Sequence, residues 1–116
     1  MTHTPKDLVD AASAAVPQVS ASDAMDLHGK EGVVFLDVRE PGEVAGGKVA
    51  GAVAIPRGVL EWQTEKLEGA ETVVIYCAAG GRAALAGETL KKLGFEDVRN
   101  AGGFKDWVES GGPTES

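Results

Sequence analysis

A β-branched run followed at once by glycines and a helix-forming segment is the feature that most constrains the fold of this chain. Residues 72–76 (TVVIY) are typical of a buried strand, and residues 83–93 are typical of a helix. The only cysteine, Cys77, lies between them and leads into a short turn, Ala78-Ala79-Gly80-Gly81-Arg82. Backbone N–H groups in such a turn can converge on one point, and the helix dipole adds to their positive potential. The sequence therefore predicts a thiol at the carboxyl end of a strand, in surroundings that stabilise a thiolate.

Two plainer interpretations fit this segment less well. Most free cysteines are small buried hydrophobes. However, Cys77 follows the strand rather than lying inside it, and packing alone requires neither the two glycines nor Arg82. A strand–turn–helix unit also occurs in phosphate-binding P-loops, but no Lys-Ser or Lys-Thr pair follows these glycines, which argues against a P-loop NTPase.

Length and cysteine usage limit the class of protein. The 116 residues are enough for one domain with a real core, and 43% hydrophobic and 25% charged residues are ordinary for a globular protein. A single cysteine cannot form an internal disulfide, which fits a reducing compartment. The sequence contains no apolar run of membrane-spanning length and no charged-then-apolar leader. We therefore expect a cytoplasmic protein with no membrane partner.

Charge and histidine content exclude two further classes of function. The net charge of −7 argues against nucleic acid as the main partner, although a local arginine and oriented amides can still hold a small anion. His3 and His28 have no metal-ligand spacing with each other or with Cys77, so we expect no metal site. We also expect no cofactor, and we expect both imidazoles to be exposed to solvent.

The remaining chain alternates between helical and extended patterns. The predicted helices cover residues 5–15, 22–28, 58–67, 83–93 and 102–109, with a helical turn at 40–45. The predicted extended segments are 16–19, 32–38, 52–55, 72–76 and 97–99. This order predicts an α/β fold, an open parallel five-stranded sheet with helices on both faces and right-handed crossovers. Ligands of such sheets bind at the carboxyl ends of the strands, where Cys77 is expected.

Four segments in this order resemble single-domain rhodaneses, a family of sulfurtransferases. They are residues 36–43 (LDVREPGE), 47–56 (GKVAGAVAIP), 74–83 (VIYCAAGGRA) and 100–107 (NAGGFKDW). Each is modest evidence alone, but the ordered set is specific and covers about residues 32–112. One departure is Lys48, which stands where the family usually has histidine. The resemblance divides the chain into an N-terminal helical extension (1–16), a rhodanese domain (17–112) and a polar tail (113–116).

The resemblance implies a mechanism and a set of site residues. Cys77 would be the nucleophile that takes sulfur from thiosulfate or a similar donor as a persulfide, and then passes it to cyanide or a thiol. The amides of the loop, from residue 78 to about Ala83, would stabilise the thiolate and the persulfide. The predicted substrate-binding residues are Ala78, Ala79, Gly80, Gly81, Arg82 and Ala83. Arg82 could contact an oxyanion of the donor or brace the loop, and a solvated arginine is the plain alternative.

Several other side chains receive structural rather than chemical interpretations. We expect Asp37 to end a strand near the loop, and Arg39 and Glu40 to pair and hold neighbouring segments, with Glu43 also structural. Trp62 and Trp107 are expected to pack in the core or at its rim. Arg57, Glu61 and Trp62 are weaker candidates for lining the mouth of the site.

Two other functions remain open at this point. The chain could be a relay that passes a Cys77 persulfide to a protein partner in biosynthesis. It could also be a rhodanese-like phosphatase or arsenate reductase, but the active loops of those enzymes are one residue longer than the spacing from Cys77 to Arg82.

Overall fold

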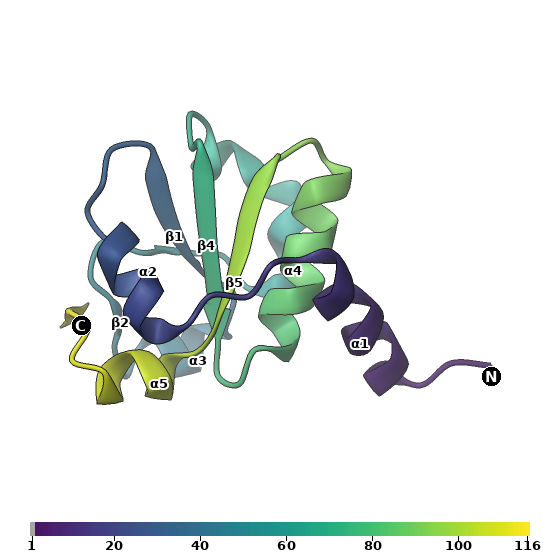
Figure 1. The fold of residues 1–116 in the computed structure, drawn as a ribbon, viewed down its shortest axis with the longest axis horizontal. Helices are drawn as coiled ribbons and strands as arrows, with labels where there is room; N and C mark the ends of the chain where they lie inside the picture. The colour runs from purple at the N-terminus through teal and green to yellow at the C-terminus, as the bar shows by residue number, and fades with distance from the viewer. Residues whose placement is uncertain (1) are drawn as a thin grey trace.

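A parallel four-stranded sheet forms the centre of the computed structural model, which describes residues 2–116 (Figure 1). Its strand order is β3-β1-β4-β5, and every neighbouring pair runs parallel. The strands are β1 (Val33–Asp37), β3 (Val53–Ala54), β4 (Thr72–Cys77) and β5 (Asp97–Gly103). The α/β class is confirmed. Strand β4 lies between β1 and β5, and because the four strands run parallel, their carboxyl ends lie at the same end of the sheet.

The predicted count of five strands is wrong by one. The expected extended segment at 16–19 makes a single parallel bridge, Gln18 to Asn100, beside β5. Its backbone bonds are Val19 N–H to the Asn100 carbonyl at 2.9 Å and Asn100 N–H to the Pro17 carbonyl at 2.8 Å. Pro17 has no N–H to donate, so the ladder is not extended on that side.

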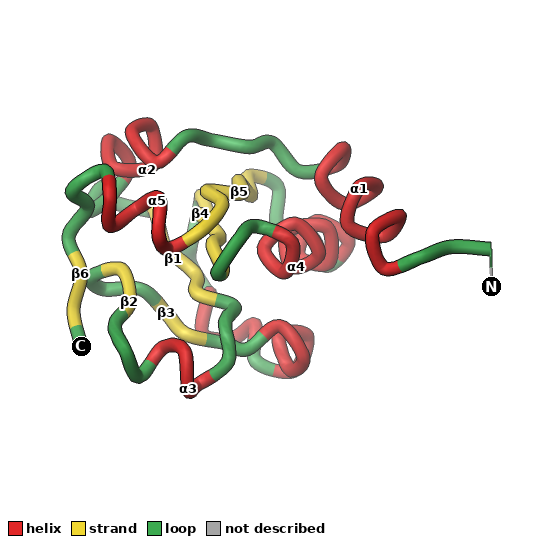
Figure 2. The backbone as a smooth tube through the Cα atoms, turned by 90° about the horizontal axis from the view of Figure 1, so that it is seen from below, coloured by secondary structure: helices red, strands yellow, loops and turns green. Residues whose placement is uncertain are grey.

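Helices cover both faces of the sheet (Figure 2). They are α1 (Pro5–Ala15), α2 (Ala21–Leu27), α3 (Pro41–Val44), α4 (Gly81–Lys92) and α5 (Phe104–Glu109). The helix expected at 58–67 is instead two 3₁₀ turns, η1 (Arg57–Trp62) and η2 (Thr64–Leu67), which bury Leu60 and Leu67 in the same core. None of the helices in residues 2–116 combines the length and the apolar character needed to cross a bilayer.

Alternation along the strands separates two cores, one on each face. Leu36, Val73 and Ile75 point toward the α4 face with Cys77, whereas Val74 and Tyr76 point toward the face covered by α2 and α5. This period of two is the reason that the Cys77 thiol faces α4 rather than the opposite helices.

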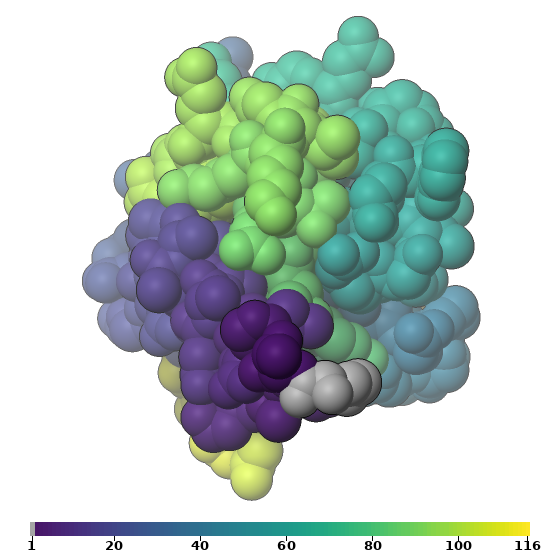
Figure 3. Space-filling view, turned by 90° about the vertical axis from the view of Figure 1, so that its right-hand side faces the viewer, coloured from purple at the N-terminus to yellow at the C-terminus, as the bar shows by residue number. Residues whose placement is uncertain are grey.

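The N-terminal helix α1 docks on α4. Its capping box is built from Thr4 and Asp7, and Pro5 occupies its first turn, as the sequence indicates. Ala12 and Val16 are buried, and the Lys91 ammonium donates to the Ala15 carbonyl at 3.0 Å. Figure 1 shows α1 beside α4, and the space-filling view shows the atoms of the N-terminal segment in front of the rest of the molecule (Figure 3).

The polar tail carries a short strand, β6 (Thr114–Glu115), which pairs antiparallel with β2 (Lys48–Val49). The Lys48 ammonium donates to the Glu115 carboxylate at 2.9 Å and to the Ala52 carbonyl at 2.7 Å. Lys48 therefore acts locally, holding the chain end and the turn after β2.

Val16 occupies a notch at Gly87 on α4, and this contact can be tested. A Cβ placed on Gly87 would come within 2.9 Å of both Val16 methyl groups. Helix propensity favours Gly87→Ala by about 1 kcal/mol, but overpacking costs about 1–3 kcal/mol, so we expect a net loss of roughly 1 kcal/mol of unfolding free energy. In a Val16→Ala background the same change should be neutral or stabilising. Urea unfolding of the four proteins measures this, and additive effects would contradict the contact.

Candidate active site

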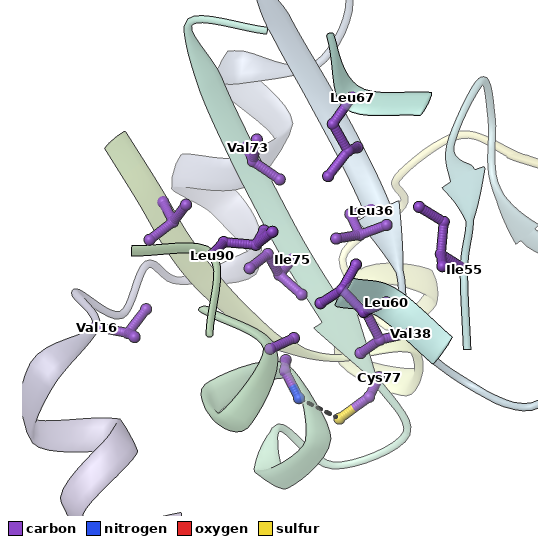
Figure 4. Packing of buried hydrophobic residues seen from close by; sticks show 13 residues of the cluster. Val16, Leu36, Val38, Ile55, Leu60, Leu67, Val73, Ile75, Cys77 and Leu90 are labelled. Carbon is purple, nitrogen blue, oxygen red and sulfur yellow. Dashed lines mark hydrogen bonds between the residues drawn. The ribbon is translucent and has the colours of Figure 1, made fainter. Parts of the chain in front are cut away.

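Cys77 is the last residue of β4 and lies at the lower end of the α4-side core (Figure 4). Only 1% of its surface is exposed. The pairing of β4 with β5 shifts register between Ile75 and Cys77, so that Cys77 is opposite Gly103. β4 advances two residues there while β5 advances three, so the extra residue lies in β5 and Cys77 keeps the alternation of β4. The thiol therefore lies on the α4 face, where the strand ends and the following loop begins.

Two backbone amides donate to the Cys77 sulfur. The Gly80 N–H lies 2.9 Å from Sγ and the Ala83 N–H lies 3.4 Å from it. Gly80 is the N-cap of α4 and has a φ of +103°, a conformation that favours glycine. Helix α4 begins at Gly81, two residues earlier than expected, so the amides of Gly81, Arg82 and Ala83 belong to its first turn and have no partner within the helix. This arrangement can stabilise negative charge on sulfur.

The end of β5 supports the loop from outside. A Cβ on Gly103 would overlap the carbonyl oxygen of Ala78, so the close approach of the two backbones requires glycine there. Asn100 is buried, and its side-chain amide donates to the Gly80 carbonyl at 3.1 Å while its side-chain oxygen accepts from the Gly102 N–H at 2.8 Å. Asn100 was not singled out from the sequence, because its partner Gly80 lies twenty positions away and no spacing rule links them.

Arg82 is not a solvated arginine. Its guanidinium binds the Glu43 carboxylate through two nitrogens, at 2.6 and 3.0 Å. Glu43 lies on α3, so the pair connects the loop after β4 to the segment after β1. The hydrogen bond from Arg82, followed by that from the Glu40 amide, lowers the pKa of Glu43 from 4.5 to about 2. Of the alternatives drawn from the sequence, the geometry is that of loop bracing.

Asp37 and Arg39 form a buried ion pair at the end of β1. Three hydrogen bonds of 2.7 to 3.1 Å join the Arg39 side chain to the Asp37 carboxylate, and Asp37 has no exposed surface. The expected pairing of Arg39 with Glu40 is therefore wrong, because the nearer buried carboxylate takes the guanidinium. The Glu40 amide instead donates to the Glu43 carboxylate at 3.0 Å.

The Arg39 side chain reaches beyond Asp37. It donates to the Gly47 carbonyl at 2.7 Å and lies over the Phe104 ring at 4.4 Å. Beside it, the Tyr76 hydroxyl accepts from the Val49 N–H at 3.0 Å, and burial raises the pKa of Tyr76. These contacts hold several segments together without placing any of the groups on the Cys77 sulfur.

Other singled-out residues lie elsewhere. Trp107 is buried and donates to the Pro113 carbonyl at 2.9 Å, but Trp62 is 83% exposed and is not a core residue. Arg57 binds Glu61 at 3.0 Å and Thr89 at 2.9 Å. His3 is exposed, whereas His28 is half-buried against Phe35 and Trp107 and bonds the Ala50 carbonyl at 2.7 Å, contrary to expectation.

With this geometry in place, comparison with known proteins identifies the family. A family model for the rhodanese-like domain matches residues 20–110. The chain belongs to this family. A sulfurtransferase of Allochromatium vinosum is 32% identical over 95 residues, covering 81% of this chain and 89% of that protein. The thiosulfate sulfurtransferase GlpE of Pseudoalteromonas translucida is 30% identical over 94 residues, covering 80% and 90% of the two chains.

Other relatives of this rhodanese-like chain have less defined roles. A Rhodopseudomonas palustris protein of unknown function, called a possible tyrosine phosphatase, superposes with a TM-score of 0.89 at 34% identity, covering 99% of this chain and 96% of that one. Two Bacillus subtilis relatives are longer. The chain spans 59% of YqhL, an uncharacterised protein, at 38% identity, and 53% of YrkF, whose name proposes a sulfur carrier, at 32% identity.

The lowered pKa of Glu43 predicts a pH dependence of stability. A carboxylate whose pKa falls on folding stabilises the native state above its unfolded value of 4.5, and this contribution is lost as the pH falls toward 2. Because the pair is about a third exposed, we expect Glu43→Gln to lower the unfolding free energy at pH 7 by no more than about 1 kcal/mol, with the difference vanishing near pH 2. Urea unfolding across this range measures it, with Glu31→Gln on an exposed turn as control. A difference that is constant with pH would contradict the assignment.

Proposed function

We propose that this chain is a sulfurtransferase that carries sulfane sulfur as a persulfide on Cys77. The observation that carries the proposal is the pair of amides, from Gly80 and Ala83, that donate to the Cys77 sulfur at the carboxyl edge of a parallel sheet. Amide donors of this kind stabilise a thiolate before the reaction and an anionic persulfide after it. Membership of the rhodanese-like family and similarity to sulfurtransferases support the same chemistry.

The proposed reaction has two displacements, with thiosulfate as the donor. The Cys77 thiolate attacks the outer sulfur of thiosulfate, a bond between the two sulfurs forms, and sulfite leaves with the electron pair of the broken S–S bond. Cyanide or a thiolate then attacks the outer sulfur of the persulfide. The C–S or S–S bond of the product forms, and the Cys77 thiolate is regenerated. No metal or cofactor is needed for either displacement.

A relay function is the first alternative. A persulfide on Cys77 could be passed to a protein partner, and the similarity to YrkF favours this possibility specifically. The side chains of Ala78 and Ala79 are small and uncharged, so they leave space for a bulky acceptor and supply little discrimination between donors. The single cysteine fits a reducing compartment, and the cytoplasm remains the proposed location.

A phosphatase or arsenate reductase function is the second alternative, and the Rhodopseudomonas palustris relative raises it. Arg82 stands five positions after Cys77, which is the shorter loop of the sulfur-handling members described above. In addition, the Arg82 guanidinium is bound to Glu43, so it is not free to hold the reacting group of a phosphate ester or of arsenate. Both features argue against phosphate-ester hydrolysis and arsenate reduction.

Intact mass measurement tests the main proposal. Thiosulfate should add the mass of one sulfur atom to the wild-type protein, and cyanide should remove it with release of thiocyanate. Cys77→Ser should gain no sulfur and keep its fold, because serine is nearly isosteric and the chain has no other cysteine. Sulfur transfer retained by this variant would exclude the mechanism. Hydrolysis of an aryl phosphate without sulfur loading would favour the phosphatase instead.

Kinetics of two variants decide the role of Arg82. If the Arg82–Glu43 pair braces the loop, Arg82→Ala and Glu43→Ala should lower kcat/KM for thiosulfate by similar factors of about two- to fivefold, because the pair is partly exposed. If the guanidinium contacts the donor, Arg82→Ala should be far more damaging than Glu43→Ala, which only frees the arginine. Arg99→Ala, on the strand β5, serves as a charge-matched control.

A further inference from the structure

We propose that Asn100 is a positioning residue that controls the reactivity of Cys77 through Gly80. The inference deepens the proposed function, since it concerns the same sulfur. Asn100 does not touch the sulfur. Its side chain instead spans the gap between the loop and the end of β5, donating to the Gly80 carbonyl and accepting from the Gly102 N–H. Gly80 is also the residue whose own N–H donates to Sγ at 2.9 Å.

The loop needs such an anchor because two glycines adjoin at this point. A peptide group between Gly80 and Gly81 has no Cβ on either side to restrict its rotation, and Gly80 already has a φ of +103°. Its carbonyl is held by two donors, the Ala84 N–H at 2.9 Å within α4 and the Asn100 side chain at 3.1 Å from outside the helix. The Gly80 N–H belongs to the preceding peptide group, and the two peptide planes meet at the Gly80 Cα. Fixing the carbonyl therefore restricts the rotation of this glycine and, with it, the direction of its own N–H.

Asn100 is itself fixed on both sides. Its strand β5 pairs with β4 at Ile75, and its backbone bonds the segment at 17–19 on the other edge. Only 4% of its surface is exposed. Both ends of the carboxamide are satisfied, which leaves a single orientation that matches donor to acceptor. The result is a fixed connection from the sheet to the carbonyl of Gly80, the residue whose own amide donates to the sulfur.

The consequence is a change in thiol reactivity when the connection is removed. Asn100→Leu keeps the shape of the side chain and loses both hydrogen bonds. A less well aligned Gly80 amide stabilises negative charge on the sulfur less, so the rate of alkylation of Cys77 by iodoacetamide at pH 7 should fall about tenfold. Asn100→Ala should slow alkylation in the same way, and Arg99→Ala, the neighbour on β5, should leave the rate unchanged.

A measurement on the unmodified protein keeps the inference testable if the Asn100 variants do not fold. In ¹⁵N-labelled wild-type protein, the Gly80 amide and the Asn100 side-chain NH₂ should both change their chemical shifts when Cys77 is alkylated. A Gly80 signal that shifts while the Asn100 NH₂ does not would overturn the proposal. An unchanged alkylation rate in a folded Asn100→Leu protein would overturn it as well.

These experiments are independent of the sulfur donor. If thiosulfate adds no sulfur but Asn100→Leu still slows alkylation, the positioning role stands and the proposed function fails. If the persulfide forms normally and the alkylation rate does not change, the proposed function stands and the role of Asn100 is refuted. Where both hold, Asn100→Leu should lower kcat for sulfur transfer with little change in KM, since the residue contacts no substrate.

Discussion

The buried ion pair of Asp37 and Arg39 is the interaction on which the rest of the site depends. Removing two charges from water is costly, and breaking such a pair by removing one partner leaves the other uncompensated. Here the guanidinium also binds Gly47 and lies over Phe104, so one side chain joins the end of β1 to β2 and α5. Helix α3 begins two residues after Arg39 and carries the carboxylate that binds Arg82. The position of the active loop is thus set from β1 as well as from β4.

The site itself is made mainly of backbone. Its donors are main-chain amides, and its turn contains two glycines. The end of β5 that packs against this turn is also a glycine, Gly103. Main-chain groups are already ordered by the sheet and by α4, so little entropy is lost when charge develops on the sulfur. Side chains such as Arg82 and Asn100 act one step further out, on the loop rather than on the reacting atom.

Much of the fold could be predicted from the sequence because its signals are local. Alternating or continuous hydrophobic runs, glycine stops and the capping residues Thr4 and Pro5 place most strands and helices within a few residues. The cysteine at the end of a strand follows from the same local signals. What could not be predicted is pairing between segments distant along the chain: the partner of Arg39, the strand at 114–115, and the bond from Asn100 to Gly80. Each depends on which neighbours the folded chain provides.

The docking of α1 has a consequence for where this domain can be cut. The family model begins at residue 20, yet Ala12 and Val16, which precede it, are buried as completely as residues of the central sheet. A fragment trimmed to the family boundary would expose an apolar strip along α4 around Gly87 and would lose Gln18, and with it the bridge to Asn100. Such a strip invites self-association. For this chain, the segment shared with the family is therefore shorter than the segment that completes the packing on α4.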